Sequence, residues 1–388
     1  MSKSFANFLK KIHFSNFIKS DGFKNFLSSL ICVLLGLICG IVIIVIADAN
    51  HSPKAIVTIL KGGFNAAKWK KGVGTVITNS IPLLLCSLSI IFAYKCGLFN
   101  IGAPGQYVMG TMFALLGAFA FKAPWYVCLL LSAVGGALWG IIPGIFKAFL
   151  NVNEVITSIM FNWIGLHILN YVAGPEAGIM YNTNLSECYE LPKRALLPNL
   201  GSEKMFDGFK YVTVAVFVAL ILAIIIQIIL SKTKFGYEIK ATGHNKDAAK
   251  YAGMSYKKNI IITMAIAGAL AGIAAGCFYL TGMEIYSATK NTATLPSVGF
   301  NGIAVAFLGG LNPIGAIVAS FLITHITVAG GYLDTTYYPK EIGDLIAAII
   351  IYLCAFSLFI KNVINKRQAK EENENKTIET KEIQEEVK

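Results

Sequence analysis

Long uninterrupted apolar runs constrain this chain more than any other feature of its sequence. The first extends from Phe26 to Ala47, and several later runs approach the roughly 20 residues that a helix needs to cross a ~30 Å hydrocarbon layer. Hydrophobic residues occupy 55 % of the 388 positions and charged residues only 14 %, which leaves more apolar surface than a soluble core can bury. The sequence therefore predicts an integral membrane protein, whose helices satisfy their own backbone hydrogen bonds.

The hydropathy pattern predicts an all-α, polytopic transmembrane helical bundle of about ten spans. The run at 297–311 is too short to cross a bilayer comfortably, which favours a broken or re-entrant segment there. The dipeptide Phe-Asn occurs at the start of two Gly-rich runs, as Phe99-Asn100 and as Phe300-Asn301. This similarity is compatible with inverted repeats and equally with chance similarity of apolar segments. The ten runs cover residues 27–47, 75–94, 99–121, 125–146, 154–173, 211–230, 260–281, 297–311, 313–333 and 342–360.

The distribution of charge indicates the orientation of the chain. The net charge is +12, but the Lys and Arg residues lie in short segments between the apolar runs, which is typical of membrane topology rather than nucleic-acid binding. We therefore expect a multi-pass protein of the cell membrane, in contact with lipid and with both termini cytoplasmic. The outer segment 48–74 is rich in lysine and goes against this bias. A cleavable signal peptide is the alternative for the N-terminus, although 26–47 is longer than a secretory hydrophobic region.

These observations divide the chain into three parts. Residues 1–26 form a cytoplasmic N-terminal segment, residues 27–360 the transmembrane domain, and residues 361–388 a Lys/Glu-rich cytoplasmic tail that is expected to be disordered. Within the transmembrane domain, the outer loop 174–210 is rich in Pro, Gly and Asn, so we expect irregular structure and contact with a partner outside the cell.

Motifs of enzymes and metal sites do not occur in the sequence. The eight cysteines include no Cys-x-x-Cys pair, and His-Glu-x-x-His, Gly-x-Ser-x-Gly and clusters of acidic residues are all missing. We therefore predict no catalytic residue, no metal ligand and no cofactor bound by this chain.

The cytoplasmic segment 231–259 is polar, basic and long. Asn245 is expected to cap a short helix through Tyr251, and Gly253 to end that helix in a left-handed turn. Such a helix suits docking into a cleft on another protein, but an ordinary positively charged loop with a surface helix explains the pattern equally well.

Several motifs in this chain, taken together and in order, resemble the nucleoside branch of the ABC importer permeases, a family that also includes ribose and branched-chain amino acid permeases. The sequence departs from the family at Pro104, where an acidic residue is usual, and at Asn153, where His is frequent. The matching motifs are Gly97 to Gln106, Glu154-Val155-Ile156 with Asn162-Trp163, Gly236-Tyr237-Glu238, Gly243-His244-Asn245, Ala248 to Met254, Gly299 to Ala306 and Asn312 to Gly315.

The resemblance implies a permease subunit that works with partner proteins. These partners would be an ABC ATP-binding subunit, a second permease subunit and an extracytoplasmic solute-binding lipoprotein. Since the chain has no Gly-x-x-x-x-Gly-Lys-Ser/Thr loop, ATP and Mg would be bound by the ATP-binding subunit. That subunit would receive the coupling segment through Glu238, Gly243, Asn245, Ala248, Ala249 and Gly253.

Polar side chains at membrane depth are costly and usually face the bundle interior, which makes them candidates for the substrate path. Amides can bind ribose hydroxyls and base edges, and phenylalanine rings can stack on a base. For each candidate the alternative is a bond to a neighbouring helix, or, for Glu284, a place in the outer headgroup zone. The candidates are Asn100, Gln106, Phe99, Asn162, Phe300, Asn301 and Glu284, with His167 as a further polar position.

Two other functions compete with a nucleoside importer. An ion-coupled secondary transporter usually needs a buried carboxylate or histidine relay, and mid-span carboxylates are nearly absent from this chain. An ABC permease for ribose or another simple sugar would share the motifs above, so the sequence leaves that alternative open.

Overall fold

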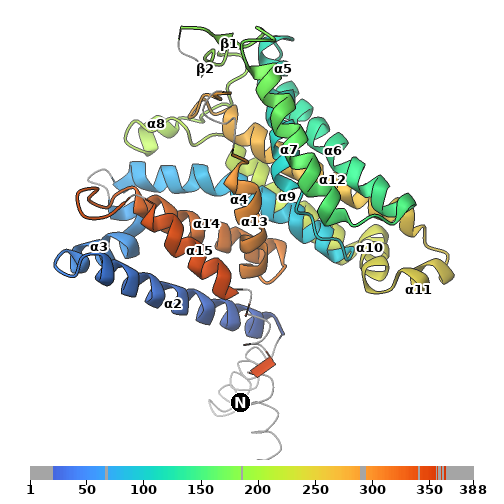
Figure 1. The fold of residues 1–388 in the computed structure, drawn as a ribbon, viewed down its shortest axis with the longest axis horizontal. Coiled ribbons are helices and arrows are strands. Elements are labelled where there is room, and N and C mark those ends of the chain that lie inside the picture. Colours follow the sequence, from blue (N-terminus) through green and yellow to red (C-terminus); the bar gives the residue numbers. More distant parts are fainter. Residues whose placement is uncertain are drawn as a thin grey trace, which may run out of the picture.

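The computed structural model is a bundle of long helices, with an extended connection between α7 and α9 (Figure 1). It describes residues 21–65, 69–184, 187–288, 294–339 and 341–354, with positions 356, 360, 362 and 363. The all-α prediction is confirmed, since the only strands in these ranges are two short antiparallel ones. The elements are α2 (Asp21–Ala47), α3 (Ser52–Lys61), η1 (Gly62–Asn65), α4 (Trp69–Lys95), α5 (Ala103–Phe119), α6 (Trp125–Leu150), α7 (Glu154–Ala173), β1 (Tyr181–Asn182), β2 (Glu187–Cys188), α8 (Ser202–Met205), α9 (Ala215–Lys232), α10 (Lys234–His244), α11 (Lys246–Tyr251), α12 (Tyr256–Tyr279), α13 (Ser297–Leu308), α14 (Pro313–Gly330) and α15 (Ile342–Cys354).

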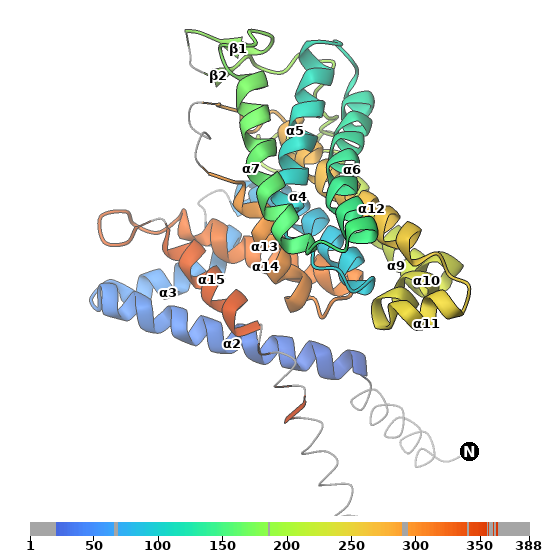
Figure 2. The same cartoon turned by 45° about the vertical axis from the view of Figure 1, so that its right-hand side comes forward.

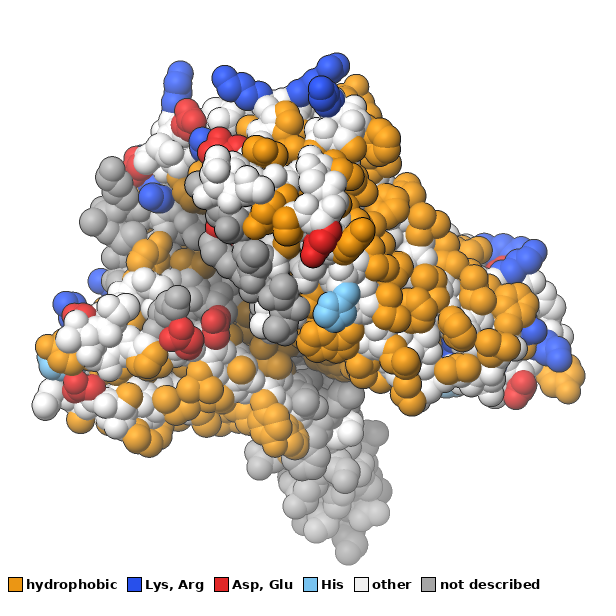
Figure 3. Space-filling model, turned by 45° about the horizontal axis from the view of Figure 1, so that its top comes forward, with side chains coloured by type: hydrophobic (Ala, Val, Ile, Leu, Met, Phe, Trp, Pro, Cys, Tyr) orange, Lys and Arg blue, Asp and Glu red, His pale blue; other side chains and the backbone are white. Residues whose placement is uncertain are grey.

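Seven of the described helices are long and apolar enough to cross a membrane, namely α2, α4, α6, α7, α9, α12 and α14. Each of the ten predicted runs contains a helix, but α5, α13 and α15 have only 17, 12 and 13 residues. Figure 3 shows hydrophobic side chains spread over the lateral face, with Lys and Arg gathered at the ends of the molecule. A multi-pass membrane protein is thus supported, while ten crossings are not established by helix length. The N-terminal residues 1–20 and the tail from 364 onward lie outside the described residues.

Several helix boundaries differ from the predicted ones for a common reason. α4 begins at Trp69 rather than 75, and α12 begins at Tyr256 rather than 260. Hydropathy falls at the lysines in these first turns, whereas helical hydrogen bonding continues through them, because charged ends extend beyond the hydrocarbon layer. The segment 48–74 also contains the short amphipathic helix α3, which hydropathy alone did not indicate.

Glycines allow α5, α6 and α12 to pack with their backbones in close contact. On α6, a Cβ atom at Gly136 would collide with the carbonyl oxygen of Gly268 and lie 2.8 Å from the Cα of Gly272. A Cβ atom at Gly110 of α5 would collide with the same Gly272. Small residues at four-residue spacing are the usual means of bringing membrane helices together, so these three helices form the most tightly packed part of the fold.

Helix α13 is a short helix beside α4 in the middle of the bundle (Figure 2). Its first turn lies against the start of α5, because a Cβ atom on Gly299 would be 2.6 Å from the nitrogen of Pro104. Near its other end, the Phe307 ring packs edge-on against Tyr94 in the last turn of α4, with centroids 5.7 Å apart. At 1.5 Å per residue, α13 rises about 18 Å, which is too short to cross a ~30 Å layer. The expectation that the run 297–311 is too short to span is therefore confirmed.

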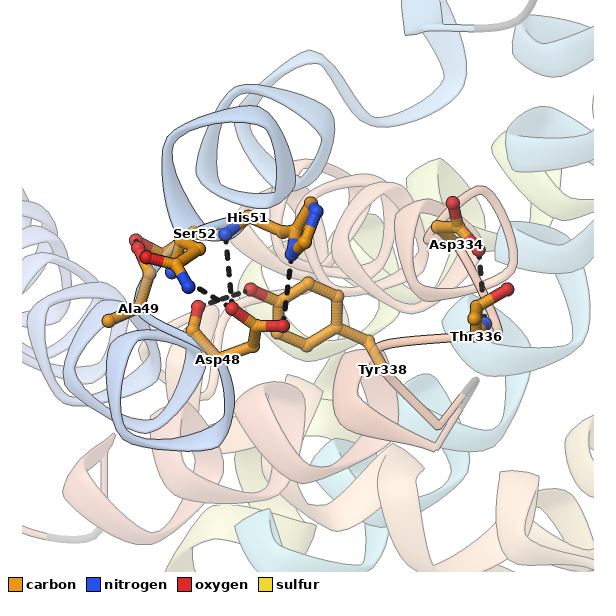
Figure 4. A network of polar contacts seen from close by, with 8 residues as sticks. Asp48, Ala49, His51, Ser52, Asp334, Thr336 and Tyr338 are labelled. Carbon is orange, nitrogen blue, oxygen red and sulfur yellow. Dashed lines mark hydrogen bonds and ion pairs between the residues drawn. The ribbon is translucent and has the colours of Figure 1, made fainter.

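A polar cluster fastens the corner between α2 and α3 to the segment before α15 (Figure 4). The Tyr338 hydroxyl donates to the Asp48 carbonyl oxygen at 2.7 Å, and the rings of His51 and Tyr337 stack with centroids 3.6 Å apart. Nδ1 of His51 lies 3.0 Å from the Asp48 carboxylate. Hydrogen bonds from the His51 side chain and backbone hold the pKa of Asp48 below its usual value.

Candidate functional site

Two of the amide side chains predicted for the substrate path form a buried network beneath the segment before α5. The Asn100 amide nitrogen donates to Ser89 Oγ at 3.0 Å and to Gln106 Oε1 at 2.9 Å, and Gln106 Nε2 donates back to Asn100 Oδ1 at 3.1 Å. Asn100 Oδ1 also accepts from the Gly102 backbone at 3.1 Å. Both amides are 1 % exposed. Their polar atoms are therefore engaged in holding the turn at 97–102 in place.

Asn162 ties α7 to the same turn. Its Oδ1 accepts from the Gly105 backbone at 2.9 Å, and its Nδ2 donates to the Ile101 carbonyl at 3.0 Å. One turn earlier on α7, Ser158 is 1 % exposed and finds no hydrogen-bond partner within the described part of the chain. Sequence reasoning did not select Ser158, although its position four residues before Asn162 puts both on one helix face.

Other path candidates remain accessible. Phe300 is 39 % exposed, while Phe99 and Asn301 are half-buried. Helix α7 exposes a broad strip that contains Trp163 and His167 at membrane depth. An imidazole facing hydrocarbon is unfavourable, so this strip is suited to face a partner subunit or a hydrated path.

Glu284 lies apart from the amides, in a cavity of about 450 Å³ beside β2. This cavity is named the outer cavity here for its place at the end of the molecule away from α11 (Figure 1). The cavity opens between the loop that follows β2, residues 210 and 211, and the turn after α12. The seven predicted path residues thus fall into three places: the amide network, the accessible positions at 99, 300 and 301, and this cavity. The apolar runs contained no signal for the cavity, because its walls come from segments far apart in the sequence.

The coupling segment folds as two short helices at one end of the molecule (Figures 1 and 2). Asn245 ends α10 and caps α11, since its Oδ1 accepts from the backbone of Asp247 at 2.9 Å and of Ala248 at 3.0 Å. Gly253 has a φ of +77° just after α11. The predicted cap, helix and left-handed turn are confirmed.

Some coupling candidates face the protein itself. Gly243 packs on backbone, because a Cβ atom there would be 2.6 Å from the Lys95 carbonyl oxygen and 2.7 Å from the Gly97 nitrogen. Ala249 is 3 % exposed. Asn259 of α12 donates to Thr242 Oγ1 at 3.0 Å, which ties α10 to α12. The coupling helices are therefore joined to both α4 and α12.

Other residues of the segment point to the solvent. Asn245, Ala248 and Gly253 are exposed, and Glu238 is half-buried with its carboxylate 3.8 Å from Lys234 Nζ. Sequence reasoning did not select Tyr251, whose side chain is 92 % exposed at the end of α11. A lone aromatic residue within a polar, basic helix is the signal that could have identified it, since tyrosine is enriched at interfaces.

Comparison with known proteins gives consistent matches. The chain is 35 % identical over 352 residues to "Guanosine ABC transporter permease protein NupP" of Bacillus subtilis, an alignment that covers 89 % of this chain and 98 % of the relative. It is 32 % identical over 308 residues to "Nucleoside ABC transporter permease protein NupB" of Lactococcus lactis, covering 77 % and 83 % of the two chains. A solved structure, "PsaBC from Streptococcus pneumoniae in complex with Fab", aligns with 79 % of this chain and 95 % of that chain at 16 % identity, with a TM-score of 0.39 that carries no argument.

Residues 72–355 match the family described as "Branched-chain amino acid transport system / permease component". This range extends from the first turn of α4 to just beyond α15 and includes the amide network, the outer cavity and the coupling helices. The chain belongs to this family of permease components.

Proposed function

We propose that this chain is the permease subunit of an ATP-driven ABC importer for nucleosides. The observation that carries the proposal is the 35 % identity to a guanosine permease protein across 98 % of that relative's length. It favours a nucleoside over ribose as the solute, and a pumped importer over an ion-coupled transporter. ATP and Mg are bound by a separate ATP-binding subunit, and a solute-binding lipoprotein delivers the nucleoside from outside.

In this proposal, α11 docks on the ATP-binding subunit through its exposed residues. Movement of α11 then passes to the permease through two contacts described above. Gly243 meets the backbone from Lys95 to Gly97, directly before the turn that the amides hold, and Thr242 is bonded to α12. Contacts between backbones have no rotatable side chain between them, so a displacement at α11 shifts the start of α5.

The path lies on a face shared with a second permease subunit. Phe99, Phe300 and Asn301 line it together with the exposed strip of α7 that carries His167. The buried amides at 100, 106 and 162 position this lining rather than contact the solute. The short helices α5 and α15 add two crossings to the seven long helices, and α13 with the non-helical residues beside it forms a broken span, which makes about ten in all. Both termini are cytoplasmic, and inverted repeats within the bundle stay a hypothesis.

The test is uptake of radiolabelled guanosine by cells that carry or lack the chain. Substitutions at Gly243 or Ala249 are poor probes of docking, because both residues pack inside the protein. Tyr251→Asp places a charge on the exposed docking face without disturbing a buried contact. Its control is Met205→Asp on α8, where the side chain is 69 % exposed at the opposite end of the molecule (Figure 1).

We expect Tyr251→Asp to lower guanosine uptake at least about tenfold, as for loss of an interface anchor worth about 2 kcal/mol, and to abolish co-purification of the ATP-binding subunit. Met205→Asp retains both. Uptake that survives Tyr251→Asp and collapses when the proton or sodium gradient is dissipated would establish a secondary transporter instead.

A further inference from the structure

The outer cavity is built by contacts that fix its walls. The backbone nitrogen of Cys188 donates to the Tyr286 carbonyl at 3.0 Å, and that of Leu197 donates to the Leu280 carbonyl at 2.9 Å. These bonds hold both ends of the loop that follows β2 against the turn after α12. Gly282 in that turn has a φ of +69°, and a Cβ atom there would be 2.9 Å from Leu196 Cδ2. The cavity is therefore a preformed feature of one permease chain.

Tyrosine rings provide much of the cavity wall. Tyr286 is held on two sides, because its hydroxyl donates to Asn170 Oδ1 at 2.6 Å and its ring packs edge-on against Tyr279 with centroids 5.9 Å apart. Tyr189 is 50 % exposed and Tyr211 is half-buried, and both belong to the lining. Accessible aromatic rings of this kind can stack on a planar heterocycle.

The charged residues in the lining balance one another. Glu190 and Glu284 carry negative charge, whereas Lys193 and Lys210 carry positive charge. Their formal sum is zero, so the cavity favours a neutral polar ligand over a phosphorylated or cationic one. Carboxylates accept hydrogen bonds from vicinal hydroxyls and from exocyclic amines, while ammonium groups donate to ring nitrogens and carbonyls. A volume of about 450 Å³ lies within the usual range of small-molecule sites.

We propose that this outer cavity is a binding site for a nucleoside, formed by one permease chain and separate from the translocation path. Ring stacking, neutral charge and hydroxyl-accepting carboxylates match the base and the ribose of that ligand. Leu115 and Tyr279 also belong to the lining, and the Tyr279 ring lies against buried Tyr107 with centroids 6.3 Å apart. The cavity therefore adjoins the packed interior of the bundle, and we expect it to hold the solute at the outer face. The choice of ligand rests on the proposed function.

The experiment measures equilibrium binding of radiolabelled guanosine to the complete permease and ATP-binding complex in lipid nanodiscs, without the binding protein. Cavity variants are Tyr189→Ala and Glu284→Gln. The matched control is Tyr126→Ala, which removes a tyrosine that is 54 % exposed in the first turn of α6 and outside the cavity. A second control, Met205→Asp, alters a side chain that is 69 % exposed on α8 and does not line the cavity.

We expect saturable guanosine binding that weakens at least about tenfold in both cavity variants and is unchanged in the two controls, with guanosine monophosphate and ribose competing poorly. Equal binding by cavity variants and controls would overturn the inference, as would absence of saturable binding. Loss of binding-protein docking in the cavity variants, with guanosine binding intact, would assign the cavity to a segment of that protein instead. Guanosine uptake is measured in the same variants to separate the two hypotheses. Uptake without binding at the cavity refutes this inference alone. Absence of nucleoside uptake in the wild type refutes the proposed function.

Discussion

Replacing Asn162 by leucine tests whether the buried amides act as structural ties. The substitution keeps the side-chain volume similar but removes both partners of the turn, namely the acceptor for the Gly105 nitrogen and the donor to the Ile101 carbonyl. Each buried backbone group left without a partner costs about 1–3 kcal/mol. Because Asn162 is 1 % exposed, water has little access to replace it. The expected loss in the free energy of unfolding is therefore about 2–6 kcal/mol.

The assay is reversible unfolding of the purified permease in mixed micelles, followed by circular dichroism while the denaturing detergent is increased. Trp163→Leu is the control, since this neighbour on α7 is 42 % exposed and its replacement should stay within about 1 kcal/mol of wild type. A cost below about 0.5 kcal/mol for Asn162→Leu, combined with a raised KM for guanosine uptake, would refute the structural role and return Asn162 to the solute path.

Two further predictions concern packing and pH. Gly272→Leu should prevent correct folding, because a Cβ atom there would collide with the Ser132 carbonyl oxygen of α6 and lie 3.1 Å from the Cα of Gly136. Loss of a monodisperse peak in size-exclusion chromatography checks this, with Gly178→Ala, in open space at a φ of +65°, expected to remain monodisperse. Asp48→Asn should lower the melting temperature of the detergent-solubilised protein at pH 7. Hydrogen bonds from His51 depress the pKa of Asp48 in the folded state, so the stability they contribute is present above the unfolded pKa of about 3.9 and is lost as the pH falls through the lower folded value. The difference between the melting temperatures of the two proteins should therefore begin to shrink as the pH falls below about 3.9, and a difference that grows as the pH falls further would contradict the assignment.

Properties that depend on neighbouring residues could be predicted from the sequence. Apolar runs identified every long helix, and the capping of α11 by Asn245 followed from the local pattern because a cap involves residues within one turn. The resemblance to the permease family rested on motifs of similarly short range, and the comparisons bear it out.

Properties that depend on distant contacts could not be predicted. Asn162 was selected as a polar residue at membrane depth, but its hydrogen bonds to Ile101 and Gly105 depend on how α7 packs against α5. Gly243 was predicted to meet the ATP-binding subunit, but it packs against the backbone of Lys95, 148 positions earlier in the sequence. The outer cavity depends on hydrogen bonds between residues far apart in the sequence, such as Cys188 and Tyr286. A hydropathy profile contains no information about such pairs.

The contact of Gly243 with the backbone of residues 95–97 has a thermodynamic consequence. Consider a protein that binds α11 more tightly in one arrangement of this contact than in another. Its binding shifts the equilibrium between the arrangements of the adjoining turn, and the shift equals the difference between the two binding free energies. By reciprocity, a ligand or substitution that stabilises one arrangement of the turn must change the affinity of α11 for its partner by an equal factor. Affinity measured at α11 is thus a direct readout of events in the interior of the permease.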